Sequence, residues 1–328
     1  INKILCSLIT RGCEGFDNFL LSEYVKSYGA ELNQIVFEDG ISISIKSINE
    51  HFSKLLPLLE LIIYKPILSK IEFQKVKKSS LNLIKKNKED PFSICFEKWR
   101  KIVYSSHPYA FNTIGNANDV SKISYEDVLC EFENFKRRDM YIISNNLKIN
   151  GKDLGTLNQK FPKEKSVTKS YDLKATNRFD CIDNDSNQVI IMIGNQTCSR
   201  KSSEYLPLKI LESYLSYGMS AALFKLFRER NGITYDIGVF NPDRGGNAPF
   251  LVYLSVSNKK ALFAFDILTS LWKNLLLNPL INDELYLAKE KLKGSFLLGN
   301  QCLDEILHRK IQLISFGITP TSEIDLYS

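Results

Sequence analysis

The segment Leu223–Phe240, LFKLFRERNGITYDIGVF, carries an arginine and a tyrosine at a spacing that suits the binding of a carbonyl oxygen. Arg228 lies shortly before Asn231-Gly232, where a helix is expected to end, and Tyr235 lies on the strand that should follow. A guanidinium at a helix end and a phenol on the next strand could converge, and both donate hydrogen bonds that stabilise an oxyanion. The same pattern also occurs at ordinary helix–strand junctions, where the arginine is solvated and the tyrosine is half-buried.

Histidines are too few to indicate a further catalytic or metal site. The sequence has three, His51, His107 and His308, and they are widely separated. His107 lies in the loop-like stretch Ser105–Tyr109, where no partner for a metal ligand or general base can be identified. Glu305 and His308 form one E-x-x-H pair, whereas carboxylate-bridged metal sites use two such pairs and two more glutamates. We therefore expect surface or structural roles for these residues.

A basic run lies between residues 70 and 88, where only one acid, Glu72, opposes seven lysines: Lys70, Lys75, Lys77, Lys78, Lys85, Lys86 and Lys88. A basic helix face could attract an acidic peptide or a nucleic acid. Aromatic side chains that could stack on bases are missing from the run except for Phe73. A solvated helix face is the simpler interpretation, and nucleic acid is not expected as a partner.

The composition is that of an ordinary folded protein, with 44% hydrophobic and 24% charged residues among 328. The net charge of +6 is lower than the clustered basic charge typical of nucleic-acid binders. The seven cysteines form no C-x-x-C pair, which favours reduced thiols over a disulfide framework or a zinc knuckle. No apolar run approaches the ~18–20 residues that cross a bilayer. We expect the sequence to be part of a longer polypeptide in the cytoplasm, or in an organelle matrix if a targeting segment has been removed.

The two halves of the sequence repeat one order of predicted elements. In each half a helix ends at Ser-Tyr-Gly and is followed by two strands joined by a turn. A long helix comes next, then a residue followed by proline, and then another helix. The predicted strands are residues 33–38, 41–45, 233–240 and 250–256, and the predicted helices after them are 48–64, 69–87, 259–277 and 282–298. This order predicts two copies of one α+β domain, each an antiparallel-rich sheet with helices packed on one face.

A change of composition separates the two halves. Residues 151–187 are rich in lysine, serine and asparagine with little apolar periodicity, which is typical of an exposed connector. Residues 189–193 then form a short apolar run that should open the second domain as a strand. We therefore place the first domain at residues 1–150, a linker at 151–187 and the second domain at 188–328.

Several of these motifs resemble the insulinase/pitrilysin superfamily of inverzincin metallopeptidases, which includes the mitochondrial processing peptidases. The segment LFKLFRERNGITYDIGVF looks like the signature of its second domain, and landmarks of its first domain resemble residues 7–12, 27–33, 90–91, 107–109 and 114–115. The resemblance implies duplicated α+β domains that form one half of a clam-shell chamber. In this family an arginine and a tyrosine seven residues later approach the substrate, which implies a substrate-binding role for Arg228 and Tyr235.

The same family binds zinc through an H-x-x-E-H motif in its first domain. The residues of this chain at the two histidine positions and the glutamate position are Lys3, Cys6 and Ser7, so the motif is degenerate. The third ligand of the family, a glutamate, should fall near residues 82–83, yet residues 73–88 contain no acid. The resemblance therefore implies a chain without zinc chemistry of its own.

In the two-subunit members of this family, one subunit carries the zinc motif and its partner carries the Arg/Tyr pair, and this sequence resembles that partner. We expect a non-catalytic, substrate-binding subunit that orients a peptide through Arg228 and Tyr235. Its expected partner is a zinc-motif insulinase-like subunit or a second copy of itself, with zinc held only by the zinc-motif subunit. Two alternatives stay open: an enzyme-derived assembly subunit without a peptidase role, and a basic protein that binds acidic peptides or nucleic acid through the Lys70–Lys88 face.

Overall fold

The computed structural model describes residues 1–105, 107–138, 140–144, 178–183, 186–234 and 236–319. These residues fall into two compact units. The first contains residues 1–89 and 111–140, and the second contains residues 90–110, 141–144 and the described residues from 178 onward. No helix within these ranges is long and apolar enough to cross a membrane.

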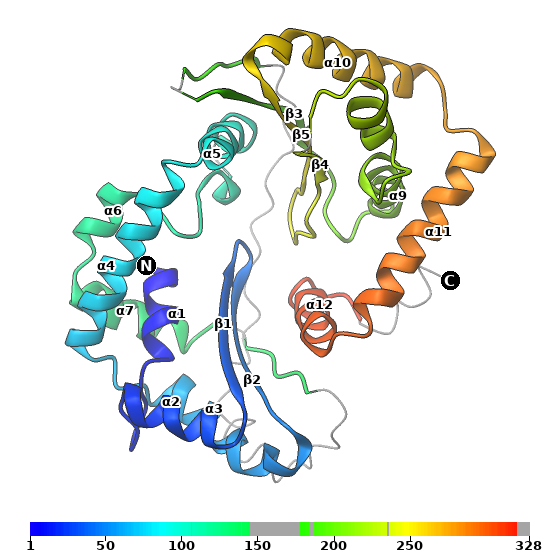
Figure 1. Cartoon of the computed structure of the whole chain (residues 1–328). Helices are drawn as coiled ribbons and strands as arrows, with labels where there is room; N and C mark the ends of the chain where they lie inside the picture. The colour runs from blue at the N-terminus through cyan, green and yellow to red at the C-terminus, as the bar shows by residue number, and fades with distance from the viewer. Residues whose placement is uncertain (106, 139, 145–177, 184–185, 235, 320–328) are drawn as a thin grey trace. The chain divides into compact units, whose positions relative to one another are not determined.

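The first unit is a two-stranded hairpin flanked by helices (Figure 1). Its elements in chain order are α1 (Asn2–Ile9), α2 (Asn18–Ser27), β1 (Glu31–Phe37), β2 (Gly40–Lys46), the short 3₁₀ helix η1 (Asn49–His51), α3 (Phe52–Tyr64), α4 (Lys70–Asn87), α6 (Ala117–Lys122) and α7 (Tyr125–Phe135). The strands pair antiparallel, with Phe37 opposite Gly40 at the turn, as the alternating apolar residues predict. Helix α3 ends at Tyr64, and Pro66 disfavours the helical conformation of the residue before it, Lys65, which is non-helical.

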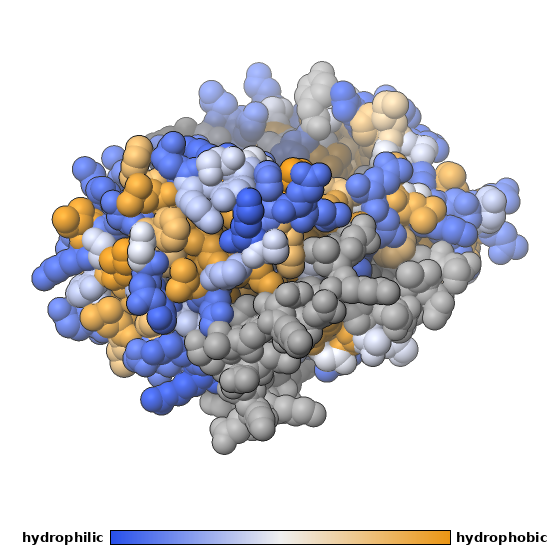
Figure 2. All heavy atoms as spheres, turned by 90° about the horizontal axis from the view of Figure 1, so that it is seen from below, coloured by the Kyte–Doolittle hydropathy of each residue, from blue (hydrophilic) through white to orange (hydrophobic). Residues whose placement is uncertain are grey.

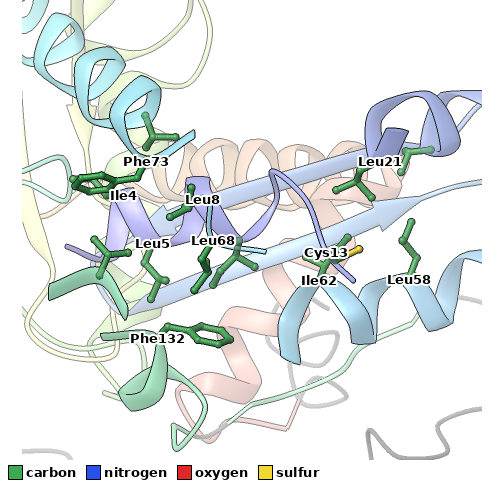
Figure 3. Packing of buried hydrophobic residues seen from close by; sticks show 14 of the residues in the cluster. Ile4, Leu5, Leu8, Cys13, Leu21, Leu58, Ile62, Leu68, Phe73 and Phe132 are labelled. Atoms are coloured by element: carbon green, nitrogen blue, oxygen red, sulfur yellow. The ribbon is translucent and has the colours of Figure 1, made fainter. Parts of the chain in front are cut away.

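Helix α1 is embedded in the hydrophobic core of the first unit (Figure 3). Its residues Ile4, Leu5 and Leu8 are 2%, 0% and 1% exposed. They share one cluster with Leu68 and with Phe73 of α4. Each such side chain contributes roughly 1.5–3 kcal/mol when it is removed from water. Apolar packing therefore fixes α1 in place.

The second unit contains a three-stranded antiparallel sheet in the order β3-β5-β4. Its elements in chain order are α5 (Pro91–Tyr104), the 3₁₀ helix η2 (Pro108–Ala110), β3 (Gln188–Gln196), α9 (Tyr205–Ser216), the π-helix η3 (Phe224–Arg230), β4 (Asp236–Phe240), β5 (Pro249–Ser257), the 3₁₀ helix η4 (Asn258–Lys260), α10 (Ala261–Leu277), α11 (Asn282–Gly299) and α12 (Leu303–Ser315). The strands predicted at residues 189–193, 233–240 and 250–256 correspond to β3, β4 and β5. Figure 2 shows the whole chain from below, where exposed apolar residues lie among polar ones.

The side chains of the central strand β5 alternate between two cores. The cluster shared with α10 takes the even positions, which are Phe250, Val252, Leu254 and Val256. Leu251 points the other way and packs with Trp99 and Tyr104 of α5. The sheet is therefore covered by helices on both faces, and the expectation that helices cover only one face is wrong. Helical periodicity marks the apolar face of α5 but does not say which sheet that face will meet.

The packing of α5 also affects the division of the chain. Residues 90–110 belong to the second compact unit, although the sequence places them between residues of the first. The predicted domain limits at residues 150 and 187 remain predictions, because most of the predicted linker, 151–187, lies outside the described residues.

The order of elements repeats, but in a different register from the one that the Ser-Tyr-Gly tripeptides indicate. The first tripeptide ends α2 and leads directly into β1, whereas the second ends α9 and is followed by η3 before β4 begins. The element that precedes the hairpin is thus α2 in one unit and η3 in the other. Gly29 and Gly232 close these two helices with φ of +58° and +53°, a left-handed conformation that glycine adopts without strain. The structural repeat therefore aligns Gly29 with Gly232 and α1 with α9.

Candidate substrate-binding site

Arg228 lies on the last turn of η3, and its side chain is exposed. Its guanidinium carbon lies 4.9 Å from the centre of the Phe224 ring, a distance at which a cation is attracted to the face of an aromatic ring. The helix has the wide π geometry. This geometry is rare in proteins, and where it occurs it is often at a functional site. The structure therefore presents Arg228 to solvent from a helical turn of unusual geometry.

The end of η3 is fixed by backbone hydrogen bonds. The N–H of Gly232 donates to the carbonyl of Arg228 at 3.2 Å, and the N–H of Ile233 donates to that of Phe227 at 2.8 Å. The bond from Gly232 to Arg228 and the positive φ of Gly232 form an αL motif, and the bond from Ile233 is a further link across the wide turn. The Lys260 ammonium donates to the carbonyl of Gly232 at 2.9 Å and ties the turn to η4. The exit from the helix is thus held at several points.

Tyr235 lies outside the described residues, so its predicted approach to Arg228 stays a prediction. Its two neighbours are described. The hydroxyl of Thr234, a residue only 3% exposed, lies within hydrogen-bond distance of the carbonyls of Asp236 and Ser255. The same hydroxyl accepts a hydrogen bond from the N–H of Asp236 at 3.1 Å. Thr234 therefore ties the beginning of β4 to β5.

The positions that would hold zinc in the resembled family lie on α1. Cys6 is 1% exposed, and burial raises the pKa of its thiol to about 11, although the charge of Lys3 acts in the opposite direction. The Ser7 hydroxyl accepts a hydrogen bond from the side-chain amide of Gln34 at 3.4 Å. Zinc requires a deprotonated thiolate, and a lysine ammonium has no lone pair to offer. Lys3, Cys6 and Ser7 therefore do not fit a zinc site.

The acid on helix α4 is Glu72, in its first turn. Its carboxylate accepts hydrogen bonds from Lys75 at 2.6 Å and from Arg11 at 2.8 Å. Lys75 and Arg11 hold the pKa of this carboxyl below its ordinary value. Across the part of the chain that the structure describes, no three histidine, cysteine or acidic side chains come together as a metal would require. Glu72 is thus engaged in an ion-pair network that links α4 to the segment after α1.

The three histidines lie in separate environments. Nδ1 of His107 accepts a hydrogen bond from the N–H of Tyr109 at 3.1 Å, and the two rings lie 4.3 Å apart. Nδ1 of His51 lies 3.1 Å from the carbonyl of Tyr28. His308 lies on α12, where burial lowers the pKa of its ring.

The basic run forms helix α4, as predicted. Six of its lysines are exposed, namely Lys70, Lys75, Lys78, Lys85, Lys86 and Lys88. Lys77 is partly buried and donates to the carbonyl of Ile123 at 2.6 Å. Most of the run is therefore a solvated face, and binding of an acidic partner there stays a prediction.

A polar network in the second unit was not foreseen from the sequence. The ammonium of Lys209 on α9 lies 3.0 Å from the Glu212 carboxylate and 3.3 Å from that of Asp243. Burial alone would lower the pKa of Lys209, but the two carboxylates outweigh this effect and raise it. Asp243 also accepts a hydrogen bond from the hydroxyl of Tyr205 at 2.8 Å. The sequence could have indicated the pair of Lys209 and Glu212, because the two are three residues apart on a helix. It could not have indicated Asp243, which comes from a distant loop.

Comparison with known proteins agrees with the α+β fold. Residues 147–292 match the family described as "Peptidase M16 inactive domain". An uncharacterized zinc protease of Rickettsia felis is 22% identical over 289 residues, which cover 86% of this chain and 69% of that protein.

Two solved structures have the same fold over 99% of this chain. The peptidase M16 inactive domain from Pseudomonas fluorescens has a TM-score of 0.83, 17% identity and 80% of its own chain covered. A chain of complex III2 from Candida albicans has a TM-score of 0.73, 12% identity and 78% of its own chain covered. The α+β fold of this chain is therefore that of these solved structures, and the match to the inactive-domain family covers somewhat less than half of the chain.

Proposed function

We propose that this chain is the substrate-binding subunit of a two-subunit M16 peptidase and that its partner supplies the zinc. The observation that carries the proposal is a contrast between two positions in the chain. On α1, the side chains at the zinc positions do not fit a metal, whereas η3 still presents Arg228 to solvent from a fixed helix end. The match to an inactive domain of the family supports the same division of labour.

Arg228 and Tyr235 would act on the peptide carbonyl. A guanidinium and a phenol donate hydrogen bonds, and fixed donors stabilise the negative charge that develops on the carbonyl oxygen during attack by water. The αL motif at Gly232 and the contacts of Thr234 hold the backbone on either side of the site. Donors on a backbone held in this way lose little freedom when the peptide binds.

Reconstitution of the chain with a zinc-motif M16 subunit tests the proposal. We expect Arg228→Ala and Tyr235→Phe each to lower kcat/KM for peptide cleavage by roughly 10²–10³-fold, the range for loss of one oxyanion donor. Glu229→Gln is the matched control, since Glu229 is an exposed neighbour on the same helix. Unchanged cleavage by both variants of the assembled pair would show that these residues do not orient the substrate.

A second candidate function is assembly without a peptidase role. The similarity to a chain of complex III2 from Candida albicans favours it, because the same fold there belongs to a component of a larger complex. This hypothesis predicts that deletion of the chain dissolves a complex on a native gel, whereas Arg228→Ala and Tyr235→Phe leave that complex intact and change no cleavage rate.

A further inference from the structure

The second unit has a groove between helices, and the proposed function does not use it. Its volume is about 680 Å³, which lies within the range of about 300–1,000 Å³ typical of ligand sites. It is lined by Tyr214 of α9, by five residues between positions 220 and 230, and by residues of α10 and α11. The five are Ser220, Ala222, Lys225, Leu226 and Arg230. The apolar lining residues are Ala222, Leu226, Phe263, Ile267, Leu271, Leu287 and Ala288. We call this feature the helical groove.

Two lysines from different helices line the helical groove. Lys225 comes from η3 and Lys291 from α11, and both line the groove. Burial lowers the pKa of Lys291, and the positive charge of Lys225 lowers it further. Arg230 adds a third cation to the lining. A negative group placed between these side chains would relieve their repulsion and replace lost hydration.

The two acids of the lining are Glu284 and Asp266, and neither is among the charges that shift the pKa of Lys291. Glu284 accepts hydrogen bonds from the Tyr214 hydroxyl and from the backbone N–H of Ile281, both at 3.3 Å. Its carboxylate thus caps the beginning of α11, seven residues or about 10 Å before Lys291. Asp266 lies on α10. Lys291 is therefore about two helical turns from the acid in the first turn of α11.

We propose that the helical groove binds a short segment of a partner protein in which an acidic residue is flanked by apolar residues. The apolar walls receive the flanking side chains, and Lys225 and Lys291 bind the carboxylate. Hydroxyl and amide side chains at Ser220, Ser270 and Asn274 also line the groove and suit the backbone of a peptide. The hydrocarbon tail of a fatty acid would gain nothing from these polar groups. This inference does not depend on Arg228 or Tyr235.

Fluorescence anisotropy with labelled probe peptides and the full chain tests the proposal. The probe is a seven-residue peptide of alternating leucine and glutamate, and the controls replace glutamate with lysine or leucine with serine. We expect the leucine–glutamate peptide to bind at least tenfold more tightly than either control. Binding that depends on charge alone, with the serine–glutamate peptide equally tight, would overturn the proposal. So would the absence of binding at millimolar peptide.

Charge reversal identifies the site. The double variant Lys225→Glu with Lys291→Glu should weaken binding of the leucine–glutamate peptide at least tenfold. Lys293→Glu is the matched control, since Lys293 is exposed on the same helix outside the groove lining, and it should change binding less than twofold. Equal affinity of the double variant and the original chain would place the peptide elsewhere and contradict the inference. Circular dichroism confirms that each variant is folded.

Two further measurements separate other occupants. Displacement of the peptide by decanoate at equal concentration would favour a fatty acid and overturn the peptide assignment. Sedimentation velocity that shows a dimer dissolved by Lys291→Glu, but not by Lys293→Glu, would assign the groove to a second copy of this chain instead.

Discussion

The backbone N–H of Ile233 donates to the carbonyl of Phe227 across the end of η3, at 2.8 Å. This bond spans six residues and brackets Arg228, so the exposed guanidinium extends from a turn whose two ends are joined. The geometry requires a left-handed residue between them, and Gly232 supplies it with a φ of +53°. The position of Arg228 thus depends on a glycine four residues later.

Replacement of Gly232 by alanine should destabilise the chain by about 1–2 kcal/mol, because an L residue with a Cβ is strained at this φ. The measurement is urea unfolding followed by circular dichroism. Gly294→Ala is the matched control: Gly294 is inside helix α11 with no atom within 4 Å of an added Cβ, so alanine there should stabilise by about 0.5–1 kcal/mol. Equal effects of the two substitutions would contradict the assigned role of Gly232.

Replacement of Glu72 by glutamine should destabilise the chain at neutral pH and have little effect in acid. Lys75 and Arg11 lower the pKa of this carboxyl in the folded state below its ordinary value of 4.5. The stabilisation by the charged form is therefore present above pH 4.5 and is lost as the pH falls through the folded-state pKa.

Unfolding curves at several pH values measure this effect, which we expect to be roughly 1–3 kcal/mol at pH 7 for hydrogen bonds to a charged group. Glu23→Gln is the control, because Glu23 and Lys26 form an exposed pair 3.9 Å apart that should contribute less than about 1 kcal/mol. A Glu72→Gln deficit that persists undiminished well below pH 4.5 would show that charge is not its cause.

Truncation of Leu251 should loosen α5, although the two are far apart in sequence. Leu251 is fully buried against Trp99 and Tyr104, and its replacement by alanine should cost about 2–5 kcal/mol. Hydrogen exchange followed by mass spectrometry should show amides of residues 91–104 exchanging at least about tenfold faster, since 1.4 kcal/mol is a factor of ten.

The control for this experiment is Leu254→Ala. Leu254 is equally buried on the same strand but belongs to the cluster shared with α10. It should destabilise the chain by a similar amount and increase exchange chiefly in α10. If both substitutions deprotect residues 91–104 to the same extent, β5 does not separate two cores.

Substitution of glutamate for Lys85 and Lys86 tests the basic face of α4, where both lysines are exposed. If this face is solvated, binding of a 20-base-pair DNA duplex should be undetectable at 150 mM salt, and the double variant should behave like the original chain. Non-specific binders typically show dissociation constants of about 10⁻⁴–10⁻⁶ M at that salt concentration. Duplex binding in this range that the double variant abolishes would revive the nucleic-acid hypothesis.

Local features of the fold were predictable from the sequence because local chemistry determines them. Alternation of isoleucine and serine over residues 41–45 predicted β2, and Pro66 and Pro279 marked the ends of α3 and α10. The helix predicted at residues 282–298 corresponds to α11 (Asn282–Gly299), a difference of one residue at its end.

Features that depend on distant parts of the chain were not predictable. The π geometry of η3 requires a backbone register that side-chain periodicity does not encode. The Ser-Tyr-Gly tripeptides indicated the wrong alignment of the two halves, which pairs α2 with α9. Each tripeptide marks the end of a helix but does not indicate which element follows that helix. For the candidate site, Arg228 and the degenerate positions Lys3, Cys6 and Ser7 stay predictions from the sequence, whereas the loop partner of Lys209 was visible only in the three-dimensional packing.

The attachment of α5 to β5 has a consequence for the order of events during synthesis. Trp99 leaves the ribosome well before Leu251, the residue that covers it, which at about 5–20 residues per second is a delay of roughly 8–30 s. During that interval the aromatic face of α5 has no sheet to pack against, while residues that belong to the first unit emerge on both sides of it. The second unit can therefore complete its core only late in translation, and a nascent chain arrested before β5 should be a substrate for chaperones that recognise exposed aromatic helices.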